Sequence, residues 1–156
     1  MMRPLSRRHR AQALIEAAAV LPLLLVLALG SVGTGRLVQA RMQLDAVSRE
    51  AARAAVLAPM PSMHGGGDAA GTAHDIGVAE GQRVADGYNM GNVHIDINFD
   101  GPFGPGSWVN ANASRDVDVL QLILGRRLFG SNATGPNRSL HSQHWERVDR
   151  FRSLSP

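Results

Sequence analysis

The sequence of 156 residues predicts an α+β protein: a long N-terminal transmembrane and amphipathic helix, then a small extracytoplasmic domain with a helix and a short antiparallel sheet. Three observations predict this class: an uncharged apolar run at 17–35, an amphipathic pattern that continues to residue 58, and the alternating segment "VHIDINFDG" at 93–101. The expected parts are a basic cytoplasmic leader at 1–11, a transmembrane helix at 12–35, an amphipathic extension at 36–58, a linker at 59–71 and the small domain at 72–156.

The apolar run has the length of a membrane span. Its nineteen residues would rise about 28 Å as a helix, close to the ~30 Å hydrocarbon thickness of a lipid bilayer. Pro22 lies inside the run, and membrane helices tolerate proline where neighbouring groups absorb the kink. Four Arg residues precede the run, whereas Arg36 and Arg41 beyond it are soon offset by acidic residues. We therefore expect the N-terminus in the cytoplasm and the bulk of the chain outside it.

A cleaved secretory signal is the alternative interpretation of this N-terminus, because it also has a basic start and an apolar stretch. The letters "VQA" before Arg41 are a weak match to a cleavage site. Against cleavage there, the apolar stretch is long for a signal, and the helical pattern continues through the supposed site.

A single helical face extends beyond the apolar run. Apolar residues recur on it at intervals of three and four: Leu37, Ala40, Leu44, Val47, Ala51, Ala54 and Ala58. Because Ala and Leu dominate this stripe, a partner helix could approach it closely. The candidates for helix–helix pairing are Leu37, Leu44, Val47 and Ala51. The stripe could equally pack on the chain's own domain, and the two uses are compatible. Pro59 then ends the helix.

One acidic residue, Glu16, lies at the start of the hydrophobic segment. Inserting a carboxylate near the membrane edge costs a few kcal/mol or less, and pairing with a positive group lowers that cost. This arrangement resembles the N-terminus of type IV pilin-like proteins and, more closely, the TadE-like family of minor pseudopilins from the tight-adherence (Tad, Flp pilus) machinery. The resemblance covers about residues 7–58 and is carried by "RRHRAQALIEAAAVLPLLL", "GTGRLVQAR" and "SREAARAA".

The resemblance implies a single-pass protein of the bacterial inner membrane that acts as a minor subunit or assembly factor of a Tad-type pilus or secretion apparatus. Its implied partners are the lipid bilayer, other pilin-like subunits and pilus assembly proteins, in homo- or hetero-oligomers. The resemblance also implies processing by a prepilin peptidase between Ala11 and Gln12. Glu16 would then become the fifth residue of the mature chain and meet the N-terminal amine of a neighbouring subunit.

This chain departs from the family pattern at two positions. Ala11 stands where the family usually has Gly before the cleaved bond, and Ala17 stands where an aromatic residue usually follows the Glu. Without cleavage, Glu16 could instead extend to the lipid headgroups among Arg8 and Arg10.

The sequence beyond the linker predicts a weak helix over 74–91, followed by two strands. The apolar side of that helix should consist of Ile76, Ala79, Val84 and Tyr88. The first strand should bury Val93, Ile95, Ile97 and Phe99, and the second, within 108–124, should bury Val109, Ala111, Ala113, Val117 and Val119. Segment 139–151 fits either a third strand or a short helix.

The sequence predicts no enzyme, no cofactor and no metal site. "DINFDG" opens like a calcium loop, but the twelfth position, which needs a Glu, is Ser107. Cysteine is absent, so there are no disulfides and no thiolate chemistry. Four of the sixteen Arg residues precede residue 11, so the rest of the chain has a net charge near zero. We therefore expect no surface that binds nucleic acid.

The alternative function is a membrane-anchored extracytoplasmic binding module with no pilus role.

Overall fold

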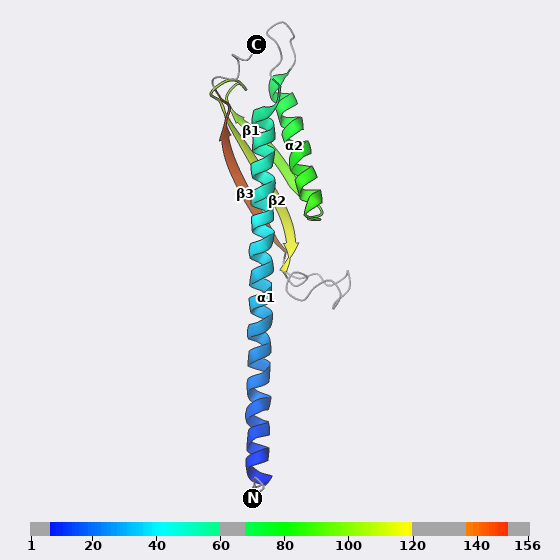
Figure 1. Ribbon diagram of the computed structural model, residues 1–156, viewed down its shortest axis with the longest axis vertical. Helices are drawn as coiled ribbons and strands as arrows, with labels where there is room; N and C mark the ends of the chain where they lie inside the picture. The colour runs from blue at the N-terminus through cyan, green and yellow to red at the C-terminus, as the bar shows by residue number, and fades with distance from the viewer. Residues whose placement is uncertain (1–6, 60–67, 120–136, 150–156) are drawn as a thin grey trace, which may run out of the picture.

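The computed structural model describes residues 7–59, 68–119 and 137–149 and confirms the α+β class (Figure 1). Its elements follow the order helix, helix and three strands. They are α1 (Arg7–Leu57), α2 (Ala69–Gly87), β1 (His94–Asp100), β2 (Trp108–Asp118) and β3 (Asn137–Arg147). Helix α2 and the sheet, here called the distal domain, pack against the C-terminal half of α1, while the N-terminal half extends away from them (Figure 1).

Helix α1 is continuous over 51 residues, which corresponds to a length of about 77 Å. Pro22 lies within it without ending it, as the sequence predicts for a membrane helix. The helix also runs unbroken through Arg41, where the alternative interpretation placed a signal cleavage site. The transmembrane and amphipathic segments expected at 12–35 and 36–58 therefore form a single rod.

Helix α2 begins earlier than the sequence predicts. It starts at Ala69, within the expected linker at 59–71, and ends at Gly87. The start is set by Asp68, whose carboxylate accepts a hydrogen bond from the backbone N–H of Gly71 at 3.0 Å. This is an ordinary N-cap, which satisfies one of the free donors of the first turn. The surrounding glycines hide the cap in the sequence.

The predicted buried side of α2 was wrong. Ala79 and Tyr88 are exposed, and Ile76 and Val84 are only half-buried. The buried residues are instead small ones at every fourth position: Ala73, Gly77, Gly81 and Ala85. The reason is close approach between α2 and its neighbours, because a Cβ atom added to Gly77 would lie 2.8 Å from the carbonyl oxygen of Ala51. The buried face of α2 is therefore the one whose residues are small enough to allow this close approach, and not the one that is most hydrophobic.

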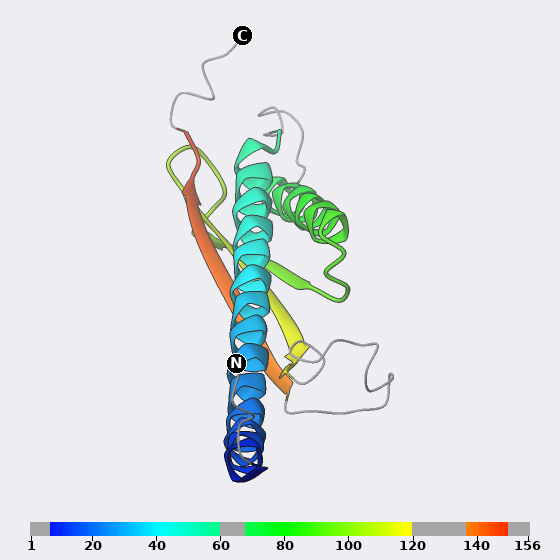
Figure 2. The same ribbon diagram turned by 60° about the horizontal axis from the view of Figure 1, so that its bottom comes forward.

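The three strands form an antiparallel sheet in the order β1-β2-β3. Segment 139–151, which the sequence leaves undecided, lies largely in strand β3, which pairs with β2 from Asn137 to Arg147. Both helices cover the same face of the sheet: α1 contacts β2 and β3, and α2 contacts β1 (Figures 1 and 2).

The first two strands bury the side that the alternation predicts. The core residues of β1 and β2 are Ile95, Ile97, Val109, Ala111, Ala113 and Val117. Val93, just before β1, joins them, and Phe99 packs partly against them. Val119, expected to continue the second strand, lies just beyond the end of β2, and residues 120–124 lie outside the described residues. The sheet therefore presents one apolar face to the helices.

A hydrogen-bonded cluster fixes α1 to β3. The Ser142 hydroxyl donates to Asp45 Oδ1 at 3.1 Å, and its oxygen lies 3.0 Å from Oγ of the buried Ser48. Arg49 Nη2 donates to the other carboxylate oxygen of Asp45 at 3.0 Å, an i,i+4 pair on the surface of α1. The cluster satisfies the buried hydroxyl group of Ser48 and ties α1 to β3.

Candidate functional site

The N-terminal half of α1 exposes a continuous apolar surface. Leu14 and Ile15 are each 71% exposed, and large apolar side chains remain uncovered as far as Val38. None of the most apolar window of this helix is buried inside the protein, and the helix is long and apolar enough to cross a membrane. An apolar surface of this size calls for lipid or another protein around it.

The polar side chains within this half bond to the helix itself. The Ser31 hydroxyl donates to the carbonyl oxygen of Leu27 at 2.9 Å, and the Thr34 hydroxyl donates to that of Gly30 at 2.9 Å. Because each hydroxyl donates its hydrogen bond to a carbonyl oxygen of the preceding turn, it does not need an acceptor from the lipid, which offers none. These residues are therefore compatible with a lipid environment.

Glu16 lies on the exposed surface in the first turns of α1. Its Oε1 accepts a hydrogen bond from Nε2 of Gln12, one turn earlier, at 3.2 Å. Ala11 precedes Gln12 in the same helix. The bond to Gln12 is intramolecular and neutral on the donor side, so it does not neutralise the charge of the Glu16 carboxylate.

The structure separates the residues proposed for helix–helix pairing into two groups. Leu44, Val47 and Ala51 are fully buried against the distal domain, where they pack in the cluster that joins α1 to α2 and the sheet. Leu37 is 37% exposed and Glu16 is exposed. Of the two compatible uses of the amphipathic stripe, the described contacts show packing on the chain's own domain. The surface open to a neighbouring chain lies further toward the N-terminus.

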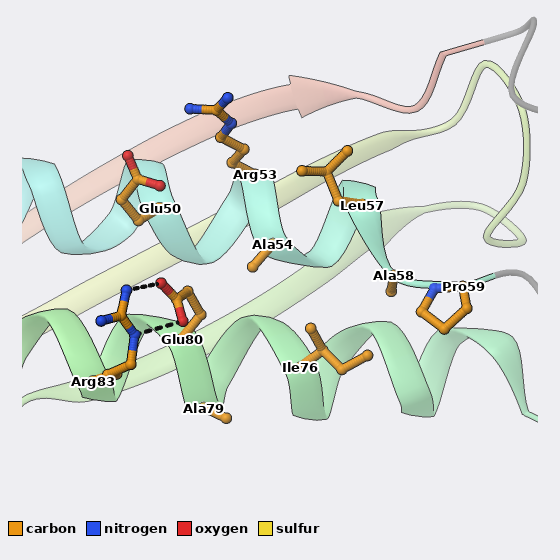
Figure 3. A pocket seen from close by; sticks show the side chains of 10 residues that line it. All are labelled: Glu50, Arg53, Ala54, Leu57, Ala58, Pro59, Ile76, Ala79, Glu80 and Arg83. Atoms are coloured by element: carbon orange, nitrogen blue, oxygen red, sulfur yellow. Dashed lines mark hydrogen bonds and ion pairs between the residues drawn. The ribbon is translucent and has the colours of Figure 1, made fainter.

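A second surface is the open groove between the end of α1 and α2 (Figure 3). Charged residues gather at one end of it, where Arg83 Nε donates to Glu80 Oε2 at 2.8 Å. This hydrogen bond lowers the pKa of Glu80 and raises the pKa of Arg83 from their ordinary values. Leu57 and Ile76 line the other end. A groove of such mixed character does not identify a class of ligand.

The segment that resembles a calcium loop forms a strand. Asp96, Asn98 and Asp100 alternate along the exposed side of β1, and Asn98 Nδ2 donates to Asp96 Oδ2 at 2.7 Å. Ser107 accepts a hydrogen bond from the backbone N–H of Gly104 in the turn that follows. The extended backbone, rather than a metal-binding loop, explains this run of polar residues.

Most of α1 is similar to a known protein family. Residues 11–53 match the TadE-like protein family. The match begins at Ala11 and ends inside α1, so α2 and the sheet lie outside it. It confirms the resemblance predicted from the sequence over most of the expected range. Comparisons with curated proteins and with solved structures give no match.

The TadE-like segment, residues 11–53, spans both parts of α1. It includes the exposed apolar half with Glu16 and most of the stripe that the distal domain buries. The family match and the candidate membrane helix together fit a membrane-anchored protein. Two residues outside this segment, Gly77 and Ser142, help to hold the distal domain on α1, and the sequence does not predict them. Gly77 allows α2 to approach α1 closely, and Ser142 bonds to Asp45 from a distant strand; neither contact leaves a local sequence pattern.

Proposed function

We propose that the protein is a pilin-like, single-pass membrane protein without enzymatic activity, acting as a minor subunit or assembly factor of a Tad-type pilus or secretion apparatus. One observation carries the proposal. The TadE-like segment coincides with a single continuous helix whose N-terminal half is apolar, exposed and uncovered by the rest of the chain. That half can enter a membrane or pack among similar helices, while the other half holds the distal domain at a fixed position on the rod.

The proposed orientation follows from the flanking charges. Arg residues at positions 3, 7, 8 and 10 precede the span and favour the cytoplasmic side of the inner membrane. The distal domain then lies outside the cytoplasm, held to α1 by the shared core and by the cluster of Asp45, Ser48 and Ser142.

Glu16 has a specific role in this proposal. Prepilin peptidase would cut between Ala11 and Gln12, which leaves a new N-terminal amine one helical turn from Glu16. The Glu16 carboxylate of one subunit would pair with the amine of the next and set the register between their helices. The exposed apolar side chains on either side would exclude water from that pair, which strengthens the attraction.

A topology measurement tests the proposed orientation. A periplasm-specific reporter enzyme fused after Pro156 is expected to be active, because the Arg-rich flank keeps the N-terminus in the cytoplasm. The matched control is a cytoplasm-specific reporter at the same junction, which should be inactive. The opposite pattern of activities would overturn the assignment of the distal domain to the outside.

Processing gives a second prediction. Mass spectrometry of the protein from cells with a prepilin peptidase should find an N-terminus at Gln12. Ala11→Gly should raise the cleaved fraction, because it restores the Gly that the family usually has before the bond, whereas Ala11→Leu should abolish cleavage. A mature chain that starts at Arg41 would instead establish the secretory-signal interpretation and contradict the proposed anchor.

A further inference from the structure

The face of the sheet that points away from α1 and α2 carries both tryptophans of the chain. Trp108 of β2 is 43% exposed and Trp145 of β3 is 52% exposed. The register pairs Asn110 with Trp145, so the two indoles are diagonal neighbours on this face, roughly 7–8 Å apart at the backbone. We call this surface, with Trp108, Trp145 and the polar residues between and beside them, the tryptophan face.

The Trp108 ring is held in place from one side. The guanidinium carbon of Arg147 lies 5.7 Å from the centroid of the ring, a cation–π contact. Arg147 is itself fixed, because its Nε donates to the carbonyl oxygen of Gly106 at 3.3 Å. A large apolar ring that is already ordered costs little conformational entropy when it binds a ligand.

Hydrogen-bonding side chains surround the two rings. Asn110 lies on β2 between Trp108 and Asn112 and is 3% exposed. Its Oδ1 is buried and has no hydrogen-bond partner among the residues that the structure describes. Because this oxygen is shielded from the surface, a ligand can bond to it only after a neighbouring side chain moves, and the accessible hydrogen-bonding groups of the face come from the adjacent strand. The exposed side of β1 adds Asp96 and Asn98 to the same face.

The chemistry of the surface selects one class of ligand. We infer that the tryptophan face binds a neutral polysaccharide. Indole rings can stack on the apolar C–H face of a sugar ring, and carboxamide and carboxylate groups can bond to its hydroxyls. The surface is also an open sheet face, which suits an extended chain lying across the strands.

Other partners fit less well. The strands place four Asp residues on this face, at positions 96, 100, 116 and 118, and one Arg, Arg147. This excess of negative charge disfavours anionic polymers such as nucleic acid. The face has two aromatic anchors, but exposed aliphatic side chains are absent around them among the residues that the structure describes, unlike the apolar centre of a protein interface. The inference does not depend on the pilus proposal, since it concerns only the distal domain.

Tryptophan fluorescence gives a direct test, because both tryptophans of the chain lie on this face. The full-length protein, in a detergent without a sugar headgroup, would be titrated with cellohexaose, maltohexaose and chitohexaose. At least one is expected to give a saturable change with a millimolar or lower Kd. Trp145→Ala should weaken that binding about tenfold or more, as for a central aromatic anchor.

Two further variants separate binding from folding. Trp145→Tyr keeps a stacking ring and should bind with intermediate affinity, and Tyr88→Ala removes an exposed aromatic of similar exposure at the end of α2 and should leave binding unchanged. Circular dichroism would confirm the fold of each variant. The inference is overturned if none of the three sugars gives a saturable change, or if Trp145→Ala binds as tightly as the unchanged chain. It is also overturned if fluorescence depends on protein concentration alone, which would make the face an interface between copies.

Discussion

Gly77→Val is expected to destabilise the distal domain by about 3 kcal/mol, because it forces a branched side chain into the contact between α2 and α1. A single Cβ atom at this position would already lie 2.8 Å from the carbonyl oxygen of Ala51 and 2.9 Å from Cβ of Ala55, and it would overlap Cδ1 of Ile97. The backbone oxygen belongs to the C-terminal part of α1, within the buried core that α1 shares with the distal domain, and cannot move aside. Helix α2 must therefore shift away from α1 and from the sheet, which opens the core.

The measurement is thermal or denaturant unfolding of the full-length protein in detergent, followed by circular dichroism and tryptophan fluorescence. Gly87→Ala is the matched control, because a Cβ atom at Gly87 has no neighbour within 4 Å. It should leave stability unchanged or raise it slightly, since alanine favours the helix by up to about 1 kcal/mol. Equal stability of Gly77→Val and the unchanged chain would contradict the close packing of α2.

Glu16→Gln is expected to weaken association with other pilin-like subunits by roughly 5- to 150-fold, the equivalent of about 1 to 3 kcal/mol for a charged hydrogen bond. The variant keeps the size of the side chain and can still bond to Gln12, but it cannot neutralise the amine of a neighbour. Membrane insertion should be unchanged or improved, because a charge has been removed. Co-purification from membranes at matched expression levels gives the association.

Two control variants isolate the charge. Glu16→Asp keeps the carboxylate but shortens its reach, so intermediate association is expected. Asp75→Asn removes an exposed carboxylate from α2, far from the apolar half of α1, and should leave association intact. Unchanged association in Glu16→Gln would mean that the carboxylate only extends to the lipid headgroups.

The sequence predicts those parts of the fold in which hydrophobicity alone sets the pattern. The apolar run and the stripe after it predict α1 well, because burial or lipid contact acts on every turn of it. Strands β1 and β2 are equally clear, since Ile95, Ile97 and Val109 alternate with polar residues. The inward side of β3 carries half-buried polar residues such as Ser142 and His144. Its sequence therefore lacks the alternation of apolar and polar residues that would identify it as a strand.

The parts that the sequence does not predict depend on contacts between distant elements. The buried face of α2 consists of glycine and alanine because α1 and β1 approach it closely, and a hydrophobicity pattern points instead to Ile76 and Val84. The amphipathic stripe of α1 shows a different limit. Leu44 and Val47 would look the same in the sequence whether their partner were a second chain or the chain's own sheet. Only the fold shows that the distal domain covers them.

Photo-crosslinking from Val20 tests the central claim most directly, that exposed α1 surface near Glu16 packs against pilin-like partners. Val20 is 50% exposed and lies one turn from Glu16 on the same face of α1, so a photo-crosslinking amino acid placed there would report the immediate neighbours of that carboxylate. In cells with a Tad-type apparatus, the account predicts adducts with pilin-like subunits or pilus assembly proteins. These adducts should be strongly reduced by Glu16→Gln and retained with Asp75→Asn. Adducts with lipid alone, or protein adducts that Glu16→Gln leaves unchanged, would contradict it.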